Sequence, residues 1–390
     1  MKTQVGIIGA GPAGLTLARL LEKAGIESVV LESRSRTYVE GRIRAGVLEQ
    51  GTADLLVAAG VGQRMQREGI VHHGIELQFD GRRHRIPLSE LAGGRSIVIY
   101  GQTEVVKDLI AARVATDAPL LFEVDDVSVH DLATERPRIR FRHDATNYEL
   151  ECDVVAGCDG FRGVCRSAIP AGVLRTFERN YPYAWLGILA AVAPSNPELV
   201  YAHGERGFAL LSLRSAELSR LYVQCRPDED IDEWPDERIW AELQARLGID
   251  GWTLEEGPIL EKGVTGMRSY VVEPMQHGRL FLAGDAAHIV PPTGAKGLNL
   301  AIGDVRVLAD ALVGWYTQGD RQALDGYSTA CLRRVWRAEH FSWWMTSMLH
   351  RDDDAGEFDR ALQLSQLRYL TTSTAAATVL AENYVGIETV

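Results

Sequence analysis

The sequence predicts an α/β protein in which a parallel sheet flanked by helices is interrupted by a second, mostly β unit and followed by a helical C-terminal region. Three patterns indicate this fold class. A β-branched run, a glycine-rich turn and an amphipathic stretch open the chain, residues 181–275 are rich in alternating β-branched and aromatic runs, and the chain from about Asn299 has helical spacing. With 390 residues, we expect two or three structural units.

The first element is a strand at residues 4–8, followed by the turn GAGPAG, a helix and a second strand that ends at Glu32. An acidic residue 23 positions after Gly9 completes the Rossmann-like dinucleotide-binding pattern. Gly9 allows the tight turn, Gly11 lets backbone amides approach a pyrophosphate, and Gly14 permits close helix packing. Glu32 is expected to accept hydrogen bonds from a ribose.

The middle of the chain continues with short elements. Residues 41–61 contain a basic turn and a helix, and residues 96–114 contain a strand, a turn and a helix. Residues 136–157 alternate as strands and end at Cys158-Asp159-Gly160. The segment 181–275 is expected to form a separate sheet.

A second polar strand end lies near the C-terminal third. Residues 279–283 form a buried strand, so Asp285 is placed where open α/β sheets bind ligands. Pro291 and Pro292 then hold the loop extended, and Gly294 and Gly297 let its backbone approach a flat ring closely. Two glycine-acid strand ends far apart in sequence favour FAD over NAD as the bound dinucleotide, because FAD extends beyond its ADP half.

Composition excludes several kinds of partner. The chain is 46% hydrophobic and carries a formal net charge of −12, so it has no electrostatic attraction for nucleic acid or anionic membrane. No apolar run could cross a bilayer, and glycines interrupt the apolar start where a signal peptide needs continuity. Five irregularly spaced cysteines argue against a disulfide framework and a metal site. We expect a cytoplasmic protein that binds small molecules.

The motifs GAGPAG, Cys158-Asp159-Gly160 and GDAAHIVPPTGAKGLN together resemble the class A flavoprotein aromatic hydroxylases. The resemblance covers essentially the whole chain and includes GRIRAGVLEQG, YGQTEV, HFSWWMTSMLHR and AENYVG. It implies an FAD-binding domain of the glutathione-reductase type (1–73, 98–180 and 268–345), an inserted substrate-binding sheet domain (74–97 and 181–267), and a C-terminal helical, dimer-interface region (346–390). The family is homodimeric, which implies a homodimer here.

The resemblance also implies a reaction. The expected substrate is 4-hydroxybenzoate, hydroxylated at position 3 to 3,4-dihydroxybenzoate with electrons from NAD(P)H and one oxygen atom from O2, through a flavin C4a-hydroperoxide. Tyr201, Tyr384 and His72 match the family's proton relay, in which the histidine exchanges the proton near solvent, and Pro292 presents its carbonyl to the substrate hydroxyl. Ser212, Arg214 and Tyr222 match the carboxylate clamp.

Cofactor contacts follow from the same resemblance. Besides Gly9, Gly11, Gly14 and Glu32, those expected at FAD are Arg42, Arg44, Gln102, Asp159, Asp285, Leu298 and Asn299, with Lys296 adding positive charge near the ring and Arg220 influencing the flavin's position. Those expected at the nicotinamide donor are Arg34, Tyr38, Arg42, Arg44, Arg162, Arg166 and Arg268. Ser33-Arg34 and Arg162 depart from the family's NADPH pattern, so we expect NADPH while NADH stays possible.

Three alternatives stay open at this stage. The same chemistry could act on 3,4-dihydroxybenzoate or 4-aminobenzoate, because an apolar pocket discriminates weakly against one extra hydroxyl. A non-hydroxylating FAD-binding redox protein is a second alternative, and a simple NAD dehydrogenase is a third. The presence of Tyr201, Tyr384 and Arg214 favours hydroxylation over the second. Bound flavin in the purified protein would exclude the third.

Overall fold

The N-terminal β-branched run lies in the middle of a mainly parallel sheet. The structure, a computed structural model, describes residues 1–42 and 46–386. Within these residues the sheet has the order β18-β19-β12-β1-β2-β8, and only β18 runs antiparallel to its neighbour. The strands are β1 (Val5–Ile8), β2 (Ser28–Leu31), β8 (Leu120–Leu121), β12 (Val154–Gly157), β18 (Gln276–His277) and β19 (Leu280–Leu282). Because β1 is buried throughout, its sequence is continuously apolar.

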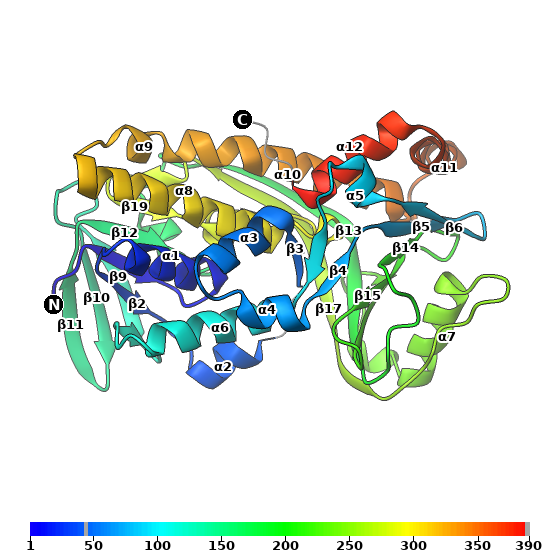
Figure 1. Cartoon of the computed structure of the whole chain (residues 1–390), viewed down its shortest axis with the longest axis horizontal. Helices are drawn as coiled ribbons and strands as arrows, with labels where there is room; N and C mark the ends of the chain where they lie inside the picture. The colour runs from blue at the N-terminus through cyan, green and yellow to red at the C-terminus, as the bar shows by residue number, and fades with distance from the viewer. Residues whose placement is uncertain (43–45, 387–390) are drawn as a thin grey trace.

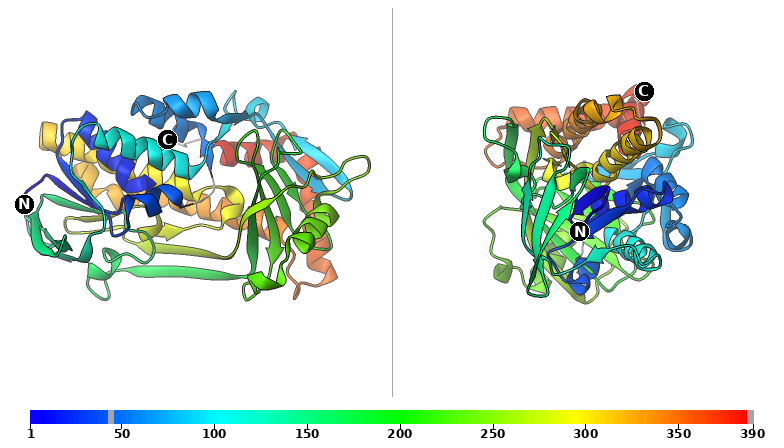
Figure 2. Two further views of the ribbon diagram at one scale, coloured as in Figure 1. Left: turned by 90° about the horizontal axis from the view of Figure 1, so that it is seen from below. Right: turned by 90° about the vertical axis from the view of Figure 1, so that its left-hand side faces the viewer.

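Helices and a second sheet enclose this parallel sheet (Figures 1 and 2). Helices α1 (Pro12–Lys23), α6 (Gln102–Val114) and α8 (Gly297–Gln318) pack together along it. The antiparallel sheet β11-β10-β9 packs on the other side and consists of β9 (Asp125–His130), β10 (Arg138–His143) and β11 (Thr146–Glu151). A Cβ on Gly6 would lie 2.5 Å from Ile139 Cδ1, so β10 packs directly against β1.

The segment expected to form a separate sheet does so. Its order is β20-β17-β13-β16-β15-β14-β5-β6 in the described part of the chain. The strands are β5 (Ile75–Phe79), β6 (Arg82–Ile86), β13 (Arg175–Ala190), β14 (Val200–Ala202), β15 (Ala209–Leu213), β16 (Ser219–Cys225), β17 (Ile259–Glu273) and β20 (His288–Ile289). The long antiparallel pair β13–β17 runs from Arg175↔Glu273 to Ala190↔Ile259 and connects the two ends of the molecule (Figure 2).

A third, antiparallel sheet lies between these parts and has the order β3-β7-β4, with β3 (Val47–Glu49), β4 (Ile70–His72) and β7 (Ile97–Ile99). The remaining helices are α2 (Arg36–Gly41), α3 (Gln50–Ala58), α4 (Gln63–Glu68), α5 (Leu88–Leu91), α7 (Asp236–Leu247), α9 (Gln322–Asp325), α10 (Tyr327–Leu349), α11 (Glu357–Thr372) and α12 (Thr374–Val385). Short 3-10 turns include η1 (Arg166–Ala168), η2 (Ile231–Glu233), η3 (Gly284–Ala286) and η4 (Pro292–Gly294).

Two hydrophobic cores divide the described residues. The first contains β1, β12, β19, α1 and α8, and the second contains β14–β16, α7, α12 and the end of α10. Helix α10 contributes Val335 to the first core and Met345 to the second. The two cores support a division between an N-terminal nucleotide-binding part and an inserted sheet part, and the three domain boundaries stay a proposal.

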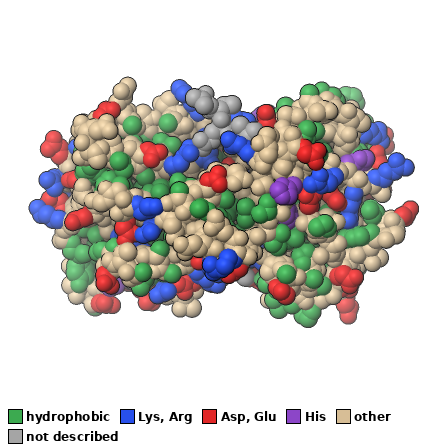
Figure 3. Space-filling model, viewed as in Figure 1, with side chains coloured by type: hydrophobic (Ala, Val, Ile, Leu, Met, Phe, Trp, Pro, Cys, Tyr) green, Lys and Arg blue, Asp and Glu red, His purple; other side chains and the backbone are tan. Residues whose placement is uncertain are grey.

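The surface carries charges of both signs. On the face in Figure 3, basic and acidic side chains are interspersed and form no large patch of one sign. No helix among the described residues is long and apolar enough to cross a membrane. All five cysteines are buried and unpaired, and no cluster of potential metal ligands occurs in residues 1–42 and 46–386.

Candidate active site

The glycine-rich turn between β1 and α1 packs against backbone on one side and is open on the other. Gly9 has a φ of 106°, and a Cβ there would lie 2.2 Å from the Cys158 carbonyl oxygen. A Cβ on Gly14 would lie 2.0 Å from the Gly9 carbonyl oxygen, whereas one on Gly11 would meet nothing within 4 Å. No side chain caps α1, so its first amides have no side-chain acceptor, an arrangement that suits a pyrophosphate.

Glu32 follows β2 and stabilises this turn. Its Oε2 accepts a hydrogen bond from the Ala10 amide and its Oε1 accepts one from the Arg34 amide, each at 2.8 Å. A carboxylate has more acceptor positions than these two bonds use, so capacity remains for a ribose hydroxyl.

Two other acidic residues lie at the ends of neighbouring parallel strands, β12 and β19. Asp159 Oδ2 accepts a hydrogen bond from the Cys165 amide at 2.9 Å, while its buried Oδ1 has no partner among the described residues. Burial raises the pKa of Asp159. Asp285, in η3, is exposed. An unpaired buried acceptor after one strand and an exposed carboxylate after its neighbour are groups that the polar chain of a flavin nucleotide could satisfy.

Lys296, Leu298 and Asn299 lie where η4 meets α8. Lys296 Nζ donates to Glu49 Oε1 at 2.7 Å and to the Tyr384 carbonyl oxygen at 3.0 Å. Asn299 accepts from the Glu49 amide and donates to the carbonyls of Val47 and Ala295. Leu298 is half-buried beside them. The two polar side chains therefore fasten the loop to β3, and the charge of Lys296 is paired with Glu49.

A cavity lies between the third sheet and the large sheet, and its free space, partly open to solvent, is about 520 Å³. Its lining comes from β3, β7, β13–β16, η4 and the loops beside them: Gly46, Val47, Ile99, Trp185, Leu199, Tyr201, Leu210, Ser212, Leu213, Arg214, Arg220, Tyr222, Pro292 and Ala295.

The carboxylate clamp predicted from the sequence lines one part of this cavity. Ser212 is in β15, Arg214 follows it, and Tyr222 is opposite Leu210 in β16. Arg214 Nη2 donates to Thr103 Oγ1 at 3.2 Å. Burial lowers the pKa of Arg214, and Glu104 opposes that shift, so the guanidinium stays charged in a partly dehydrated site.

Arg220 and Tyr222 lie side by side on the cavity wall. Arg220 Nε donates to the Tyr222 hydroxyl at 3.3 Å, and its buried Nη1 has no hydrogen-bond partner within the described residues. A guanidinium nitrogen left open in this way can donate to a ligand in the cavity.

Tyr201 and Tyr384 form the polar contact on the other part of the cavity. Their hydroxyl oxygens are 2.5 Å apart, and both side chains are buried. Burial raises the pKa of both, so each hydroxyl stays protonated near neutral pH and can donate and accept at once. Pro292, in η4, lines the same cavity.

His72, in β4, is 1% exposed, whereas the sequence predicted a place near solvent. It pairs with Ile97 of β7 in the third sheet, and both ring nitrogens lack a hydrogen-bond partner among the residues described. Burial lowers its pKa to about 4, against the opposing charge of Glu198. The structure brings Tyr201 and Tyr384 into contact and records no hydrogen bond from either to His72 within its described residues.

The residues predicted to contact the nicotinamide donor form two groups. Arg34 and Tyr38 are exposed, with the guanidinium 5.4 Å from the ring centre. In the second group, Arg268 lies 3.6 Å from the centre of the Phe161 ring, and Arg166 donates to the carbonyl oxygens of Phe161 and Ala286. Arg162 is exposed and precedes Gly163 in the loop after Phe161.

Three more of the predicted FAD contacts lie elsewhere. Gln102 begins α6, Arg42 is exposed, and Arg44 lies outside the described residues.

The sequence matches the family described as "FAD binding domain" over residues 2–342. It is 51% identical over 388 residues to p-hydroxybenzoate hydroxylase from Acinetobacter baylyi, covering 99% of this chain and 96% of that protein. The chain belongs to the class A FAD-dependent hydroxylases. This hydroxylase therefore binds FAD, and the open N-terminus of α1 and the unpaired Asp159 Oδ1 fit that cofactor.

A more distant sequence relative and a solved structure are also similar to this chain. The hydroxylase is 27% identical over 338 residues to 3-(3-hydroxy-phenyl)propionate/3-hydroxycinnamic acid hydroxylase from Mycobacterium avium, covering 80% of this chain and about half (54%) of that protein. The crystal structure of p-nitrophenol 4-monooxygenase from Pseudomonas putida superposes with a TM-score of 0.86 at 20% identity, covering 100% of both chains. The predicted fold class, a glutathione-reductase-type FAD-binding domain with an inserted sheet and a helical C-terminal region, is confirmed.

Sequence reasoning missed three residues of this hydroxylase's site. Glu49 binds Lys296, Trp185 lines the cavity, and a Cβ on Gly101 would lie 2.2 Å from Arg214 Cζ. The sequence signals were a lone acid in an apolar strand, a tryptophan in an apolar run and a glycine preceding a helix. None is specific, since each also occurs in ordinary packing.

Proposed function

We propose that this hydroxylase is an FAD-dependent 4-hydroxybenzoate 3-monooxygenase. It converts 4-hydroxybenzoate, O2, NAD(P)H and a proton into 3,4-dihydroxybenzoate, NAD(P)⁺ and water. The observation that carries the proposal is one cavity lined by the half-buried guanidinium of Arg214 and by the buried hydroxyl of Tyr201, which is hydrogen-bonded to Tyr384. The likeness to a protein named p-hydroxybenzoate hydroxylase supports the same substrate.

Bound FAD supplies the redox chemistry that activates O2, and the chain supplies binding, orientation and exclusion of water. We propose that the amides at Gly11 hold the pyrophosphate, that Glu32 binds a ribose, and that Asp159 and Asp285 contact the polar chain beyond it. Gly9 and Gly14 hold the turn in shape. Arg42, Arg44, Gln102, Leu298 and Asn299 complete the proposed cofactor contacts, and Arg220 is proposed to influence where the flavin lies.

The substrate carboxylate is proposed to lie against Arg214, with Ser212 and Tyr222 as further donors. A guanidinium can form two parallel hydrogen bonds with a carboxylate, which fixes the direction of the ring. Because Arg214 is partly dehydrated, its pairing with a charged ligand is stronger than in water. The hydroxyl end then points toward Tyr201 and the carbonyl of Pro292.

Hydroxylation is faster when the phenol has lost its proton, since the ring is then richer in electrons. We propose that Tyr201 accepts the phenol proton while it donates its own to Tyr384. Both tyrosines have raised pKa values and act as relays, so a further acceptor is needed. His72 is proposed for that part, because its neutral ring has both nitrogens open.

NADPH is the proposed electron donor, with NADH as the alternative. Arg34 and Arg162 are exposed and carry the charge that a ribose 2′-phosphate would require, and Tyr38 lies beside Arg34. Arg166 and Arg268 are proposed to border the same surface. Arg34→Ala should lower kcat/KM for NADPH more than for NADH, measured under saturating substrate, and an equal reduction for both donors would contradict a phosphate-binding role.

A homodimer is the proposed assembly. Helix α11 exposes Phe358 (75%), Leu362 (54%) and Tyr369 (59%) at helical spacing that places all three on one face. An apolar stripe of this kind favours a protein partner over water. Phe358→Asp should convert dimers to monomers in light scattering, and a wild-type protein that is already monomeric would refute the assembly.

The decisive experiment measures NADPH and NADH oxidation, O2 uptake and product with 4-hydroxybenzoate, 3,4-dihydroxybenzoate, 4-aminobenzoate and benzoate. We expect stimulated oxidation with nearly full conversion to product only for 4-hydroxybenzoate. No stimulation by any of these acids would defeat the proposal.

A variant of Tyr201 tests the proton relay. Tyr201→Phe should still allow flavin reduction but release mostly hydrogen peroxide, whereas Tyr148→Phe, which changes an exposed tyrosine on β11, should match the wild type.

A further inference from the structure

One cavity wall is held by a residue that does not line the cavity. Trp185, on β13, lines it, with the indole 4.7 Å from the Tyr222 ring centre. Against the indole lies His350, the residue immediately after α10, at 1% exposure. Trp185 Nε1 donates to His350 Nε2 at 2.6 Å.

The hydrogen bonds of His350 fix which nitrogen carries the proton. Nδ1 lies 3.0 Å from the Thr346 carbonyl oxygen, which can only accept, so Nδ1 is protonated. Nε2 is then left as an acceptor for the indole N–H, which can only donate. Burial lowers the pKa of His350 to about 3, so the ring stays neutral. One tautomer satisfies both neighbours.

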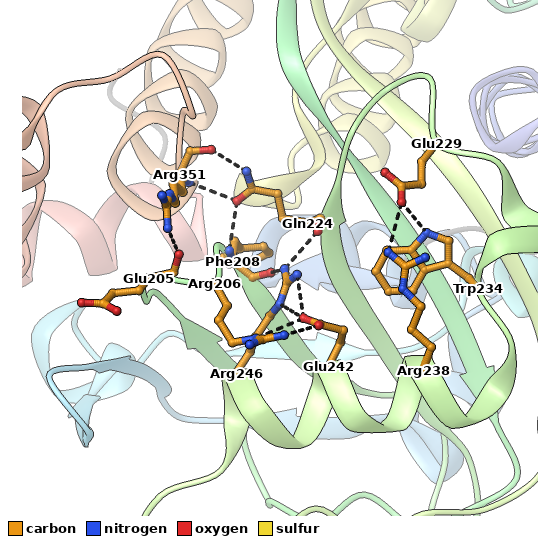
Figure 4. A network of polar contacts seen from close by, with 10 residues as sticks. All are labelled: Glu205, Arg206, Phe208, Gln224, Glu229, Trp234, Arg238, Glu242, Arg246 and Arg351. Atoms are coloured by element: carbon orange, nitrogen blue, oxygen red, sulfur yellow. Dashed lines mark hydrogen bonds and ion pairs between the residues drawn. The ribbon is translucent and has the colours of Figure 1, made fainter.

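Aromatic rings and backbone contacts leave His350 little freedom to move. The Tyr183 ring stacks on it at 4.8 Å and the Phe208 ring lies at 4.4 Å. The next residue, Arg351, is fastened to β16 by Gln224, whose Oε1 accepts from the Arg351 amide at 3.0 Å and whose Nε2 donates to the Arg351 carbonyl (Figure 4). Gln224 Oε1 also accepts from the Phe208 amide. The histidine is therefore a fixed point.

We propose that His350 is a positioning residue that holds the Trp185 indole as a wall of the substrate cavity and so sets affinity for the aromatic ring. The reason is that the indole N–H can only donate, and the acceptor in the structure is His350 Nε2. Without an acceptor, a buried indole N–H is left unsatisfied, and the ring would turn to find another partner. Turning would change the shape of the cavity beside Tyr222. The inference rests on the proposed function, since it concerns how the same cavity binds its substrate.

The test is a double-mutant cycle on the FAD-loaded protein, with 4-hydroxybenzoate binding followed by the change in flavin absorbance. His350→Phe keeps the ring stack and removes the acceptor. We expect it to raise Kd roughly tenfold in the wild-type background and less than about twofold in Trp185→Phe, which lacks the donor. KM should rise with Kd while kcat changes little, and His350→Gln, which keeps an acceptor oxygen, should restore part of the affinity.

The matched control is His340→Phe, an exposed histidine on the same helix beside Trp343, which should leave Kd unchanged. An equal loss in both backgrounds, or no loss, would overturn the inference. If His350→Phe does not fold, the comparison of His350→Gln with His350→Leu serves instead, and equal Kd values for the two would overturn it. Failure of the wild-type protein to bind any hydroxybenzoate would instead defeat the proposed function.

Discussion

The turn that faces the pyrophosphate and the cavity that faces the aromatic ring are built in opposite ways. The turn depends on the absence of side chains, because a Cβ added at Gly9 or at Gly14 would lie within 2.2 Å of a backbone carbonyl oxygen. The cavity depends on side chains that are present, such as Tyr201 and Arg214 on its wall, and Tyr384 comes from a distant segment to hydrogen-bond Tyr201. Backbone cannot move to make room, whereas a side chain can rotate. The two regions should therefore respond differently to the same kind of substitution.

The largest effect is expected from Gly14→Ala. Its Cβ would lie 2.0 Å from the Gly9 carbonyl oxygen, so the turn must deform, at a cost on the order of 3 kcal/mol. We expect loss of bound FAD, measured as the flavin-to-protein ratio, and a lower melting temperature of the apoprotein. Gly11→Ala is the control, because its Cβ meets nothing within 4 Å: the apoprotein should melt like the wild type. Full FAD content in Gly14→Ala would contradict this account.

The next effect concerns the charged end of the cavity. Arg214→Gln keeps a hydrogen-bond donor but removes the charge from a half-buried site, and it should raise the Kd for 4-hydroxybenzoate roughly a hundredfold. The Kd of Arg214→Lys should lie between those of the wild type and Arg214→Gln, since an ammonium keeps the charge but cannot form the paired hydrogen bonds of a guanidinium. Arg140→Gln, which breaks an exposed pair with Glu149, should have no effect on the titration. A Kd within fivefold of the wild type in Arg214→Gln would refute the clamp.

Lowering the pH should destabilise one hydrophobic core before the other. In the second core, burial lowers the pKa of His72 to about 4 and that of His350 to about 3, so their neutral forms stabilise the fold above pH 6.5 and this stability is lost as pH falls toward 4. In the first core, burial lowers the pKa of His288, but Asp304 outweighs it and raises the pKa overall, so acid does not weaken that site.

Hydrogen exchange at pH 7 and pH 5 measures this difference. Peptides from β4, β14 and the end of α10 should lose protection first, with roughly 2 kcal/mol lost through His72 between these two pH values. Peptides from β1 and β12 should keep their protection. Simultaneous loss in both regions would show that the histidines do not set the acid response.

The smallest effect is expected from Gly101→Ala. This variant compares the two regions most directly, because it makes the same glycine-to-alanine change at the cavity that Gly14→Ala makes in the turn. A Cβ on Gly101 would lie 2.2 Å from Arg214 Cζ, the far end of a flexible side chain. Gly101→Ala should therefore fold and bind FAD normally but displace the guanidinium and raise the Kd for 4-hydroxybenzoate roughly tenfold. Loss of FAD in this variant would show that the two regions do not differ in the way described.

The same contrast explains what the sequence could predict. The nucleotide end is local: Gly9, Gly14 and Glu32 have a fixed spacing that the backbone requires, so the motif alone located it. The cavity is not local, and Tyr201 and Tyr384 are 183 positions apart in the chain, so only the family resemblance brought them together in advance. His350 and Trp185 could not be paired at all, because their contact depends on where α10 ends over the large sheet.

The paired strands β13 and β17 have a consequence for engineering. Their pairing runs from Arg175↔Glu273 in the nucleotide half to Ala190↔Ile259 in the inserted sheet, and its register shifts at Asn180/Ala184 and at Leu189/Ala190. The cavity half is therefore not an exchangeable module. A chimera that imports another enzyme's cavity must import both strands with their irregularities, because a one-residue slip in either would turn inward-facing side chains outward along the whole ladder.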